Sequence, residues 1–296
     1  PRTREAGVAG ESGARPSASE WAPRPPQWPP RISIANPAPA LRQTSLLRGP
    51  LPVELEVWAA PGRSIAGVTV SVDDQIVYQG ERPPASGELS VDTYAIGDGT
   101  HLLTVEAVDD RGAATKHTVA FSVANRWERR SDLDPPLQSM MGLIDRTLVH
   151  ERSQGWRHAA DDGAPLFGDR GRMVYEGAGP GHLVWKSPIS PDGGRHRPEI
   201  QTFTVEFYVR SGDLREVLTI AVSPDGAAWT AVPFDVEIVE SSGDWHRVRV
   251  TGRVDVPGER EYFRLTLMGG GAGDGPDVPA AGEIQLGAVR FGGVWR

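Results

Sequence analysis

The chain has 296 residues, enough for two domains with separate cores, a formal net charge of −8 at pH 7 and no cysteine. The acidic balance argues against nucleic-acid binding, which needs a concentrated basic surface. The lack of cysteine excludes disulfides, zinc–thiolate sites and a cysteine nucleophile. No apolar run reaches the roughly 18 residues of a membrane-spanning helix. The sequence begins with Pro1 rather than Met, so we expect a mature form, a fragment or a sequence without its leader.

Residues 1–30 are predicted to be a proline-rich tail or linker. Prolines recur among small and charged residues, a composition that buries too little apolar surface to fold alone. The alternative is that the tail docks on another copy of the chain. In that case Trp21 and Trp28 would be its anchors, and Ile32 and Ile34 would add a strand to the neighbouring copy.

Residues 31–125 show the period-2 alternation of a β-sandwich, as in Val68, Val70 and Val72. Short strand candidates follow one another, separated by turns every eight to twelve residues or so. The run from Asp98 to Asn125 resembles the end of bacterial immunoglobulin-like domains. The resemblance implies that this unit serves mainly as a spacer.

Residues 126–139 are charged and include two adjacent prolines, so we predict a linker there. Residues 140–296 then carry a series of strand candidates without a convincing helix, which favours a jelly roll. The expected fold is therefore all-β: two β-sandwiches in tandem, immunoglobulin-like and then jelly roll, behind a proline-rich tail.

The stretch 218–232 is the best-defined hairpin of the second unit. Apolar residues alternate along its first strand, and Pro224, Asp225 and Gly226 supply a turn. The pattern Ser-x-Asp-Gly-x-x-Trp, from Ser223 to Trp229, resembles the central hairpin of galactose-binding-like (discoidin-like) jelly-roll modules. Such modules are appended to many secreted bacterial carbohydrate-active enzymes. The resemblance implies carbohydrate binding outside the cell or at its surface.

Strand alternation predicts which side chains of the second unit leave the core. Phe203, Val205 and Phe207 should face inward, so the residues between them should face outward. Aromatic rings stack on sugar rings, and guanidinium and carboxylate groups bind hydroxyls. The alternatives are a solvated sheet face and a protein interface. The predicted sugar-binding face consists of Tyr208, Trp245, Tyr262, Glu206, Arg247, Arg249 and Arg264.

Residue patterns also bear on metal binding and catalysis. Galactose-binding-like modules often carry a structural calcium, and the residues here that could match are Asp145, Glu151, Asp169 and Glu283; surface charges are the alternative. No Gly-x-Ser-x-Gly or His-Glu-x-x-His motif occurs. We therefore predict a non-catalytic extracellular bacterial protein whose jelly roll binds a polysaccharide or glycan. The alternative is a structural subunit of a surface layer, filament or sheath.

Overall fold

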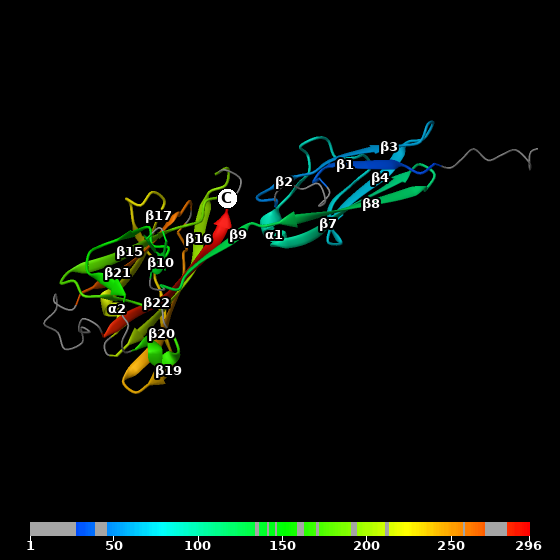
Figure 1. Cartoon of the computed structure of the whole chain (residues 1–296). Coiled ribbons are helices and arrows are strands. Elements are labelled where there is room, and N and C mark those ends of the chain that lie inside the picture. The colour runs from blue at the N-terminus through cyan, green and yellow to red at the C-terminus, as the bar shows by residue number, and fades with distance from the viewer. Residues whose placement is uncertain are drawn as a thin grey trace, which may run out of the picture.

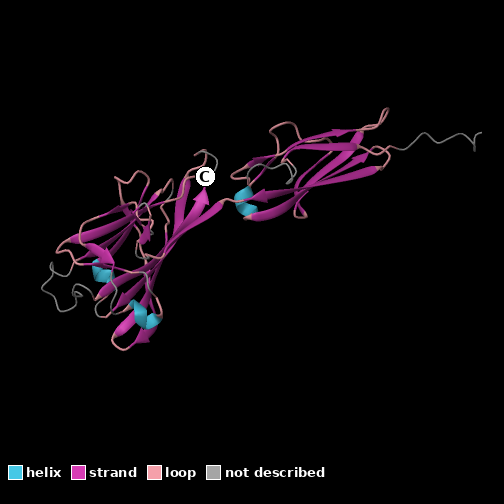
Figure 2. Cartoon of the chain, in the orientation of Figure 1, coloured by secondary structure: helices cyan, strands magenta, loops and turns pink. Residues whose placement is uncertain are grey.

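The computed structural model describes residues 28–38, 46–133, 136–140, 142–145, 147–158, 163–169, 172–190, 194–210, 213–256, 258–269 and 283–296. The prediction of an all-β chain is confirmed, since 57% of the described residues are in strands and 5% in helices (Figure 2). In the described ranges the helices are single turns: α1 (Thr93–Ile96), the 3-10 helix η3 (Ala164–Phe167) and α2 (Leu214–Val217). None of these is long and apolar enough to cross a membrane.

The first unit surrounds a core formed between Leu51 and Val123. Its strands are β1 (Arg31–Asn36), β2 (Leu51–Pro52), β3 (Glu54–Trp58), β4 (Ile65–Val72), β5 (Gln75–Gly80), β6 (Ser90–Val91), β7 (Gly99–Asp109) and β8 (Ala114–Val123). One antiparallel sheet has the order β5-β4-β7-β8, while β1 pairs with β3 and β2 with β6. Val68, Val70 and Val72 of β4 point into the core, as their alternation predicts.

The second unit packs two sheets face to face around a larger core (Figure 1). One sheet joins β12 (Glu151–Arg152), β15 (Pro180–Lys186), β21 (Tyr262–Met268), β17 (Leu218–Ser223) and β18 (Thr230–Ala231) in that order. The other joins β13 (Trp156–His158), β14 (Met173–Tyr175), β22 (Ile284–Trp295), β16 (Pro198–Val209), β20 (Trp245–Arg253) and β19 (Asp235–Ser242), with β9 (Arg126–Ser131) also paired to β22. A separate two-stranded pair consists of β10 (Leu137–Ser139) and β11 (Gly142–Ile144).

Aromatic rings hold the two sheets of this unit together. Phe263 of β21 stacks on Phe291 of β22, with ring centroids 5.2 Å apart and planes at 9°. Trp127 of β9 meets the same Phe291 edge-on at 5.8 Å. Both rings of the first pair are fully buried, so this contact joins the middle of the core.

The segment that we predicted as a linker begins as a strand of the second unit. β9 runs antiparallel to β22, from Arg126 opposite Val294 to Ser131 opposite Val289. Trp127 and Ser131 are buried and the residues between them are more exposed, which is the strand alternation that the charged composition concealed. The chain thus passes from the first unit into the seven-stranded sheet within two residues of the end of β8.

Asn125 is the central residue of this junction, and it is buried. Its side-chain oxygen accepts a hydrogen bond from the backbone N–H of Gly49 at 2.9 Å, and its side-chain nitrogen donates to the hydroxyl of Thr93 at 2.9 Å. Its backbone carbonyl accepts from the N–H of Trp295 at 2.7 Å. One residue therefore bonds to both units.

Replacing Asn125 by alanine is expected to lower the free energy of unfolding by about 1–3 kcal/mol, because the N–H of Gly49 and the hydroxyl of Thr93 each lose a buried partner. Urea unfolding followed by circular dichroism measures the change. Thr100→Ala removes an exposed hydroxyl from the first unit and serves as the control. An unchanged midpoint for Asn125→Ala would show that water replaces these bonds without cost.

The residues predicted to mediate assembly occupy different environments. Ile32 and Ile34 pack against the core of the first unit, and their strand β1 pairs with β3 of the same chain. The prediction that they insert into a second molecule is therefore wrong, because they would have to leave their own core. Trp28 is 61% exposed, and Trp21 lies outside the described residues.

Candidate functional site

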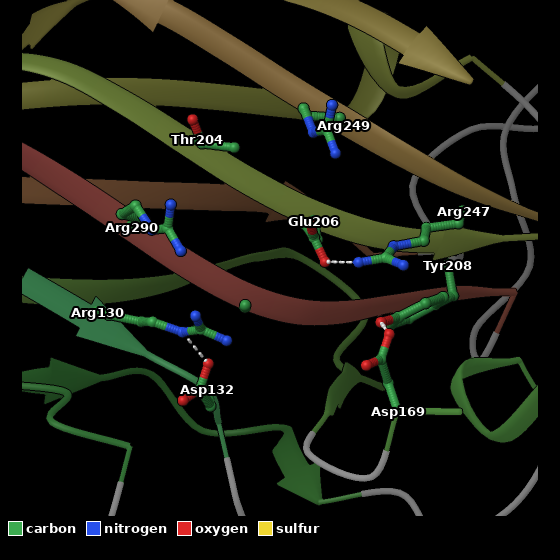
Figure 3. A pocket seen from close by; sticks show the side chains of 10 residues that line it. Arg130, Asp132, Asp169, Thr204, Glu206, Tyr208, Arg247, Arg249 and Arg290 are labelled. Carbon is green, nitrogen blue, oxygen red and sulfur yellow. Dashed lines mark hydrogen bonds and ion pairs between the residues drawn. The ribbon is translucent and has the colours of Figure 1, made fainter. Parts of the chain in front are cut away.

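A groove of about 700 Å³ lies on the face of the seven-stranded sheet that points away from the core. Four neighbouring strands, β9, β22, β16 and β20, form its floor. Most of its lining is polar, and much of it is charged. The lining residues are Arg130, Asp132, Asp169, Thr204, Glu206, Tyr208, Arg247, Arg249, Ala288 and Arg290 (Figure 3).

The alternation of β16 gives the groove its polar floor. Phe203, Val205 and Phe207 are buried in the core, so Thr204 and Glu206 project from the opposite face. Glu206 stands opposite Arg249, and Thr204 stands opposite Arg290 on the other side. Strand pairing therefore brings Thr204 beside Arg290, which lies more than 80 positions later in the sequence.

A register shift in β22 opens the floor beside Glu206. Between the pairs Val205–Val289 and Phe207–Leu286, β22 contains one extra residue. Gly287 lies at this point, where a Cβ atom would come within 2.9 Å of the Tyr208 ring. Glycine therefore permits a close approach, and the following residue, Ala288, adds only a methyl group to the groove.

Two arginines of the groove are already paired with carboxylates. Arg247 donates to Glu206 at 2.7 Å, and Arg130 pairs with Asp132 at 2.5 Å. The hydrogen bond that Arg247 donates to Glu206 raises the pKa of Arg247, and the one that Arg130 donates to Asp132 raises the pKa of Arg130. Both guanidinium groups therefore stay charged. The pair of Arg247 and Glu206 is mostly buried and is held more firmly than the half-exposed pair of Arg130 and Asp132.

Two further arginines keep donors available. Arg249 lies 3.9 Å from Glu237, and Arg290 lies 3.4 Å from Glu128, and both carboxylates are largely exposed. Neither guanidinium makes a side-chain hydrogen bond within the described part of the chain. Figure 3 places these two side chains on either side of Thr204.

Tyr208 closes one end of the groove, and it is not the exposed platform that we predicted. Its side chain is only 1% exposed, because η3 covers it and Phe167 stacks on its ring at 5.6 Å. Its hydroxyl donates to Asp169. Burial, and then the hydrogen bond to this carboxylate, raise the pKa of Tyr208 above its ordinary value.

Tyr208 is therefore expected to stay neutral at a pH where other tyrosines ionise. In an ultraviolet titration of the folded protein, Tyr208→Phe should leave the absorbance change between pH 10 and about 11 unaltered, and the same variant unfolded in urea should lose the signal of one tyrosine. The stability that Tyr208 contributes is fully present below its unfolded pKa near 10 and declines as the pH rises beyond it, because the unfolded chain releases the proton first. A smaller change in the folded variant would contradict this.

The other predicted sugar-binding residues are divided between two sheets. Glu206, Arg247 and Arg249 line the groove, as the alternation predicts. Trp245 is only 9% exposed, because it packs with Tyr208 against Ala164 of η3 and does not line the groove. Tyr262 and Arg264 belong to β21 in the five-stranded sheet, so the prediction of a single face is wrong for them.

Tyr262 and Trp229, on the side of the five-stranded sheet, each contact a cationic side chain of the same chain. The Arg264 guanidinium lies 4.1 Å from the centroid of the Trp229 ring, and Lys186 lies over Tyr262 at 5.1 Å. Period-2 alternation shows which side chains leave a core, but it does not show which of the two sheets a strand joins. Strand order depends on contacts that are distant in the sequence.

The four carboxylates predicted to bind calcium are not assembled into one site. Asp145 accepts from the backbone N–H and the hydroxyl of Thr147, at 2.9 and 2.6 Å. Asp169 accepts from Tyr208, Glu151 lies 3.3 Å from His182, and Glu283 immediately precedes β22. The described residues contain no group of three or more acidic or histidine side chains suited to a metal. Calcium binding stays a prediction, which thermal melts in calcium and in EDTA test.

Several groove residues were missed by the sequence analysis. Arg130 and Asp132 fell within the predicted linker, and Thr204, Ala288 and Arg290 had no signal beyond strand alternation. The alternation of Trp127, Arg129 and Ser131 with charged residues could have identified β9 and, with it, Arg130.

No protein-family model matches the sequence, and a search of curated proteins gave no match. A solved carbohydrate-binding module of the β-sandwich superfamily is 11% identical, with 92% of this chain and 98% of that chain covered and a TM-score of 0.25. A structure of CBM51-2 in complex with GlcNAc and INT domains from Clostridium perfringens ZmpB is 11% identical, with 67% and 38% covered and a TM-score of 0.26. A Bacteroides uniformis β-glucuronidase is 10% identical, with 88% and 30% covered and a TM-score of 0.24. At these TM-scores the similarities carry no argument, so the immunoglobulin-like and galactose-binding-like resemblances stay predictions.

Proposed function

We propose that the second unit binds carbohydrate in the groove on its seven-stranded sheet. The observation that carries this proposal is the lining itself: ten residues from five segments of the chain surround about 700 Å³, and nine of them bear a hydrogen-bonding group at the end of a charged or hydroxyl side chain. A sugar ring presents several hydroxyls that both donate and accept, and such a ligand suits fixed guanidinium and carboxylate groups.

The floor of the groove is prepared for such a ligand before binding. Arg247 and Arg130 are held by their carboxylate partners, and the side chains stand on paired strands rather than on loops. Binding therefore orders few side chains, which lowers its entropic cost. Recognition here rests on hydrogen bonds, because the rings of Tyr208 and Trp245 are covered.

Affinity electrophoresis through gels that contain one polysaccharide each tests this proposal. The panel should include neutral glucans, galactans and mannans and acidic polymers. We expect at least one polymer to retard the full chain. Absence of retardation by every polymer, at millimolar sugar concentrations, would reject carbohydrate binding.

We further propose that the chain acts outside the cell or at its surface and is not a catalyst. Because Glu206 and Asp132 are both paired with arginines in the groove, neither is expected to serve as a general acid or nucleophile. A reducing-end assay on every polymer that binds should show no release over a day. New reducing ends that disappear in Glu206→Gln would make the chain a glycosidase.

Assembly of copies is a second proposal, which one feature of the first unit favours. Trp28 and Trp58 are 61% and 47% exposed, and they line a recess of about 400 Å³. Aromatic recesses bind proline-rich segments, and residues 1–27 contain five prolines. The occupant would be that segment of a second copy. Light scattering should then show oligomers for the full chain and monomers for Trp58→Ala, whereas equal masses would reject assembly at this recess.

A further inference from the structure

We infer that the saccharide bound in the groove is acidic and that a carboxylate of the sugar, as in a hexuronate, binds at Arg290 between Arg130 and Arg249. This inference rests on the proposed carbohydrate binding and adds the chemical class of the ligand. Its basis is the distribution of charge and of occupied hydrogen-bond donors among the groove residues.

Each carboxylate of the groove has a partner within the protein. Asp132 is bonded to Arg130, Glu206 to Arg247, and Asp169 to the hydroxyl of Tyr208. These acidic groups are therefore committed to positioning their partners. They do not neutralise the remaining two arginines of the groove, Arg249 and Arg290.

Arg249 and Arg290 are the arginines of the groove whose N–H groups are available to hydrogen-bond a ligand. Their nearest carboxylates, Glu237 and Glu128, are 70% and 61% exposed, so water competes strongly for these ion pairs. The distances, 3.9 and 3.4 Å, leave the guanidinium groups free to turn toward a ligand. A carboxylate can accept two parallel hydrogen bonds from one guanidinium group, which neither exposed partner does here.

Strand register concentrates positive charge at Arg290. It stands directly opposite Arg130 on β9, and like charges in that relation are unfavourable. Arg249 is two strands away on the other side, about 10 Å across the sheet. An anion at this position relieves the repulsion between Arg290 and Arg130. Figure 3 places Thr204 between Arg290 and Arg249, so its hydroxyl can connect the bound anion to Arg249.

The charge count favours one anionic group for each bound sugar. The lining itself contains four arginines and three carboxylates, so 4 − 3 leaves one positive charge among the lining residues, while the largely exposed Glu128 and Glu237 lie beside Arg290 and Arg249 outside this lining. A single sugar carboxylate balances this charge. A densely sulfated polymer carries several negative charges on each disaccharide. The charges beyond the first would lie beside the carboxylates of Glu206, Asp132 and Asp169 and be repelled by them. We therefore assign a carboxylate rather than a sulfate.

The test uses the full chain and matched polymers. Polygalacturonate and alginate are compared with carboxyl-reduced polygalacturonate, which keeps the linkage and loses the charge, with dextran sulfate and with neutral glucans. We expect the Kd for at least one of the two polyuronates to be at least about tenfold lower than for the reduced polymer and for dextran sulfate. Raising the salt concentration should weaken this binding.

Variants locate the anion. Arg290→Ala and Arg249→Ala should each raise the Kd for the uronate about tenfold or more and leave the thermal midpoint unchanged, since both side chains are partly exposed. Arg290→Lys should restore part of the affinity. Arg82→Ala, which removes an exposed arginine of the first unit, should have no effect.

The possible failures are distinguishable. If the reduced polymer, a neutral glucan or dextran sulfate binds as well as the uronates, or if Arg290→Ala binds normally, the acidic-sugar inference is overturned while carbohydrate binding stands. If no polymer binds, both proposals are overturned.

Discussion

Replacing Tyr208 by alanine is expected to destabilise the second unit by about 3–5 kcal/mol, the range for removing a large buried ring. The Tyr208 ring is 1% exposed and stacks on Phe167, and its hydroxyl bonds to Asp169. The variant therefore leaves a cavity beneath η3 and removes the donor that holds the Asp169 carboxylate. Because Asp169 also lines the groove, we expect removal of the Tyr208 ring to change the position of this carboxylate and the shape of that end of the groove.

Urea unfolding followed by tryptophan fluorescence measures this effect, since six of the nine tryptophans lie between Trp127 and Trp295. Tyr208→Phe keeps the ring and loses only the hydrogen bond, so it should cost less, about 1–3 kcal/mol. A cost below 1 kcal/mol for Tyr208→Ala would mean that η3 does not cover the ring in solution.

Placing tryptophan at Ala288 is expected to abolish binding in the groove, with a loss in affinity of at least about 100-fold. Ala288 lies at the register shift of β22, is only half-buried and contributes one methyl group to the lining. An indole group at this point fills space that the ligand needs and leaves every arginine in place. Stability should change by less than about 1 kcal/mol, because the added ring lies outside the core.

Thr219→Trp adds the same ring to the exposed face of β17 in the other sheet, so it is the matched control. Affinity electrophoresis and calorimetry on the two variants separate the two sheets as binding faces. If Ala288→Trp keeps its affinity for the polymer and Thr219→Trp loses it, the ligand binds on the five-stranded sheet, where Tyr262 and Arg264 lie.

Local patterning was sufficient to predict the all-β class and many of the inward-facing residues. The alternation of Phe203, Val205 and Phe207 is found in β16, and the hairpin at 218–232 forms between β17 and β18. These features depend on neighbouring residues along one strand, so one sequence reveals them.

The arrangement of strands was not predictable in the same way. Arg130 and Arg290 face each other because β9 pairs with β22, although 160 positions separate the two residues. Strand alternation predicts that Tyr208 and Tyr262 both face away from the core, yet they belong to different sheets. The cover that η3 places over Tyr208 is likewise a contact distant in the sequence.

The same limitation explains the errors in function-related residues. The resemblance to galactose-binding-like modules offers Asp169 as a calcium ligand, and in the structure this carboxylate accepts a hydrogen bond from Tyr208. The charged segment after Asn125 was interpreted as a linker from its composition, whereas every second residue of β9 packs inward. Composition describes the average environment of a segment, and alternation describes its two faces separately.

The most direct test of the central claim is to locate a bound saccharide by nuclear magnetic resonance. The side-chain Nε–H signals of Arg247, Arg249 and Arg290 can be followed while an oligogalacturonate is added to ¹⁵N-labelled protein. We predict saturable shifts for these three signals and for the backbone of Thr204, with the first unit unaffected. Shifts confined to the five-stranded sheet or to the first unit, or no shifts with any saccharide that the protein retains, would contradict a binding site in this groove.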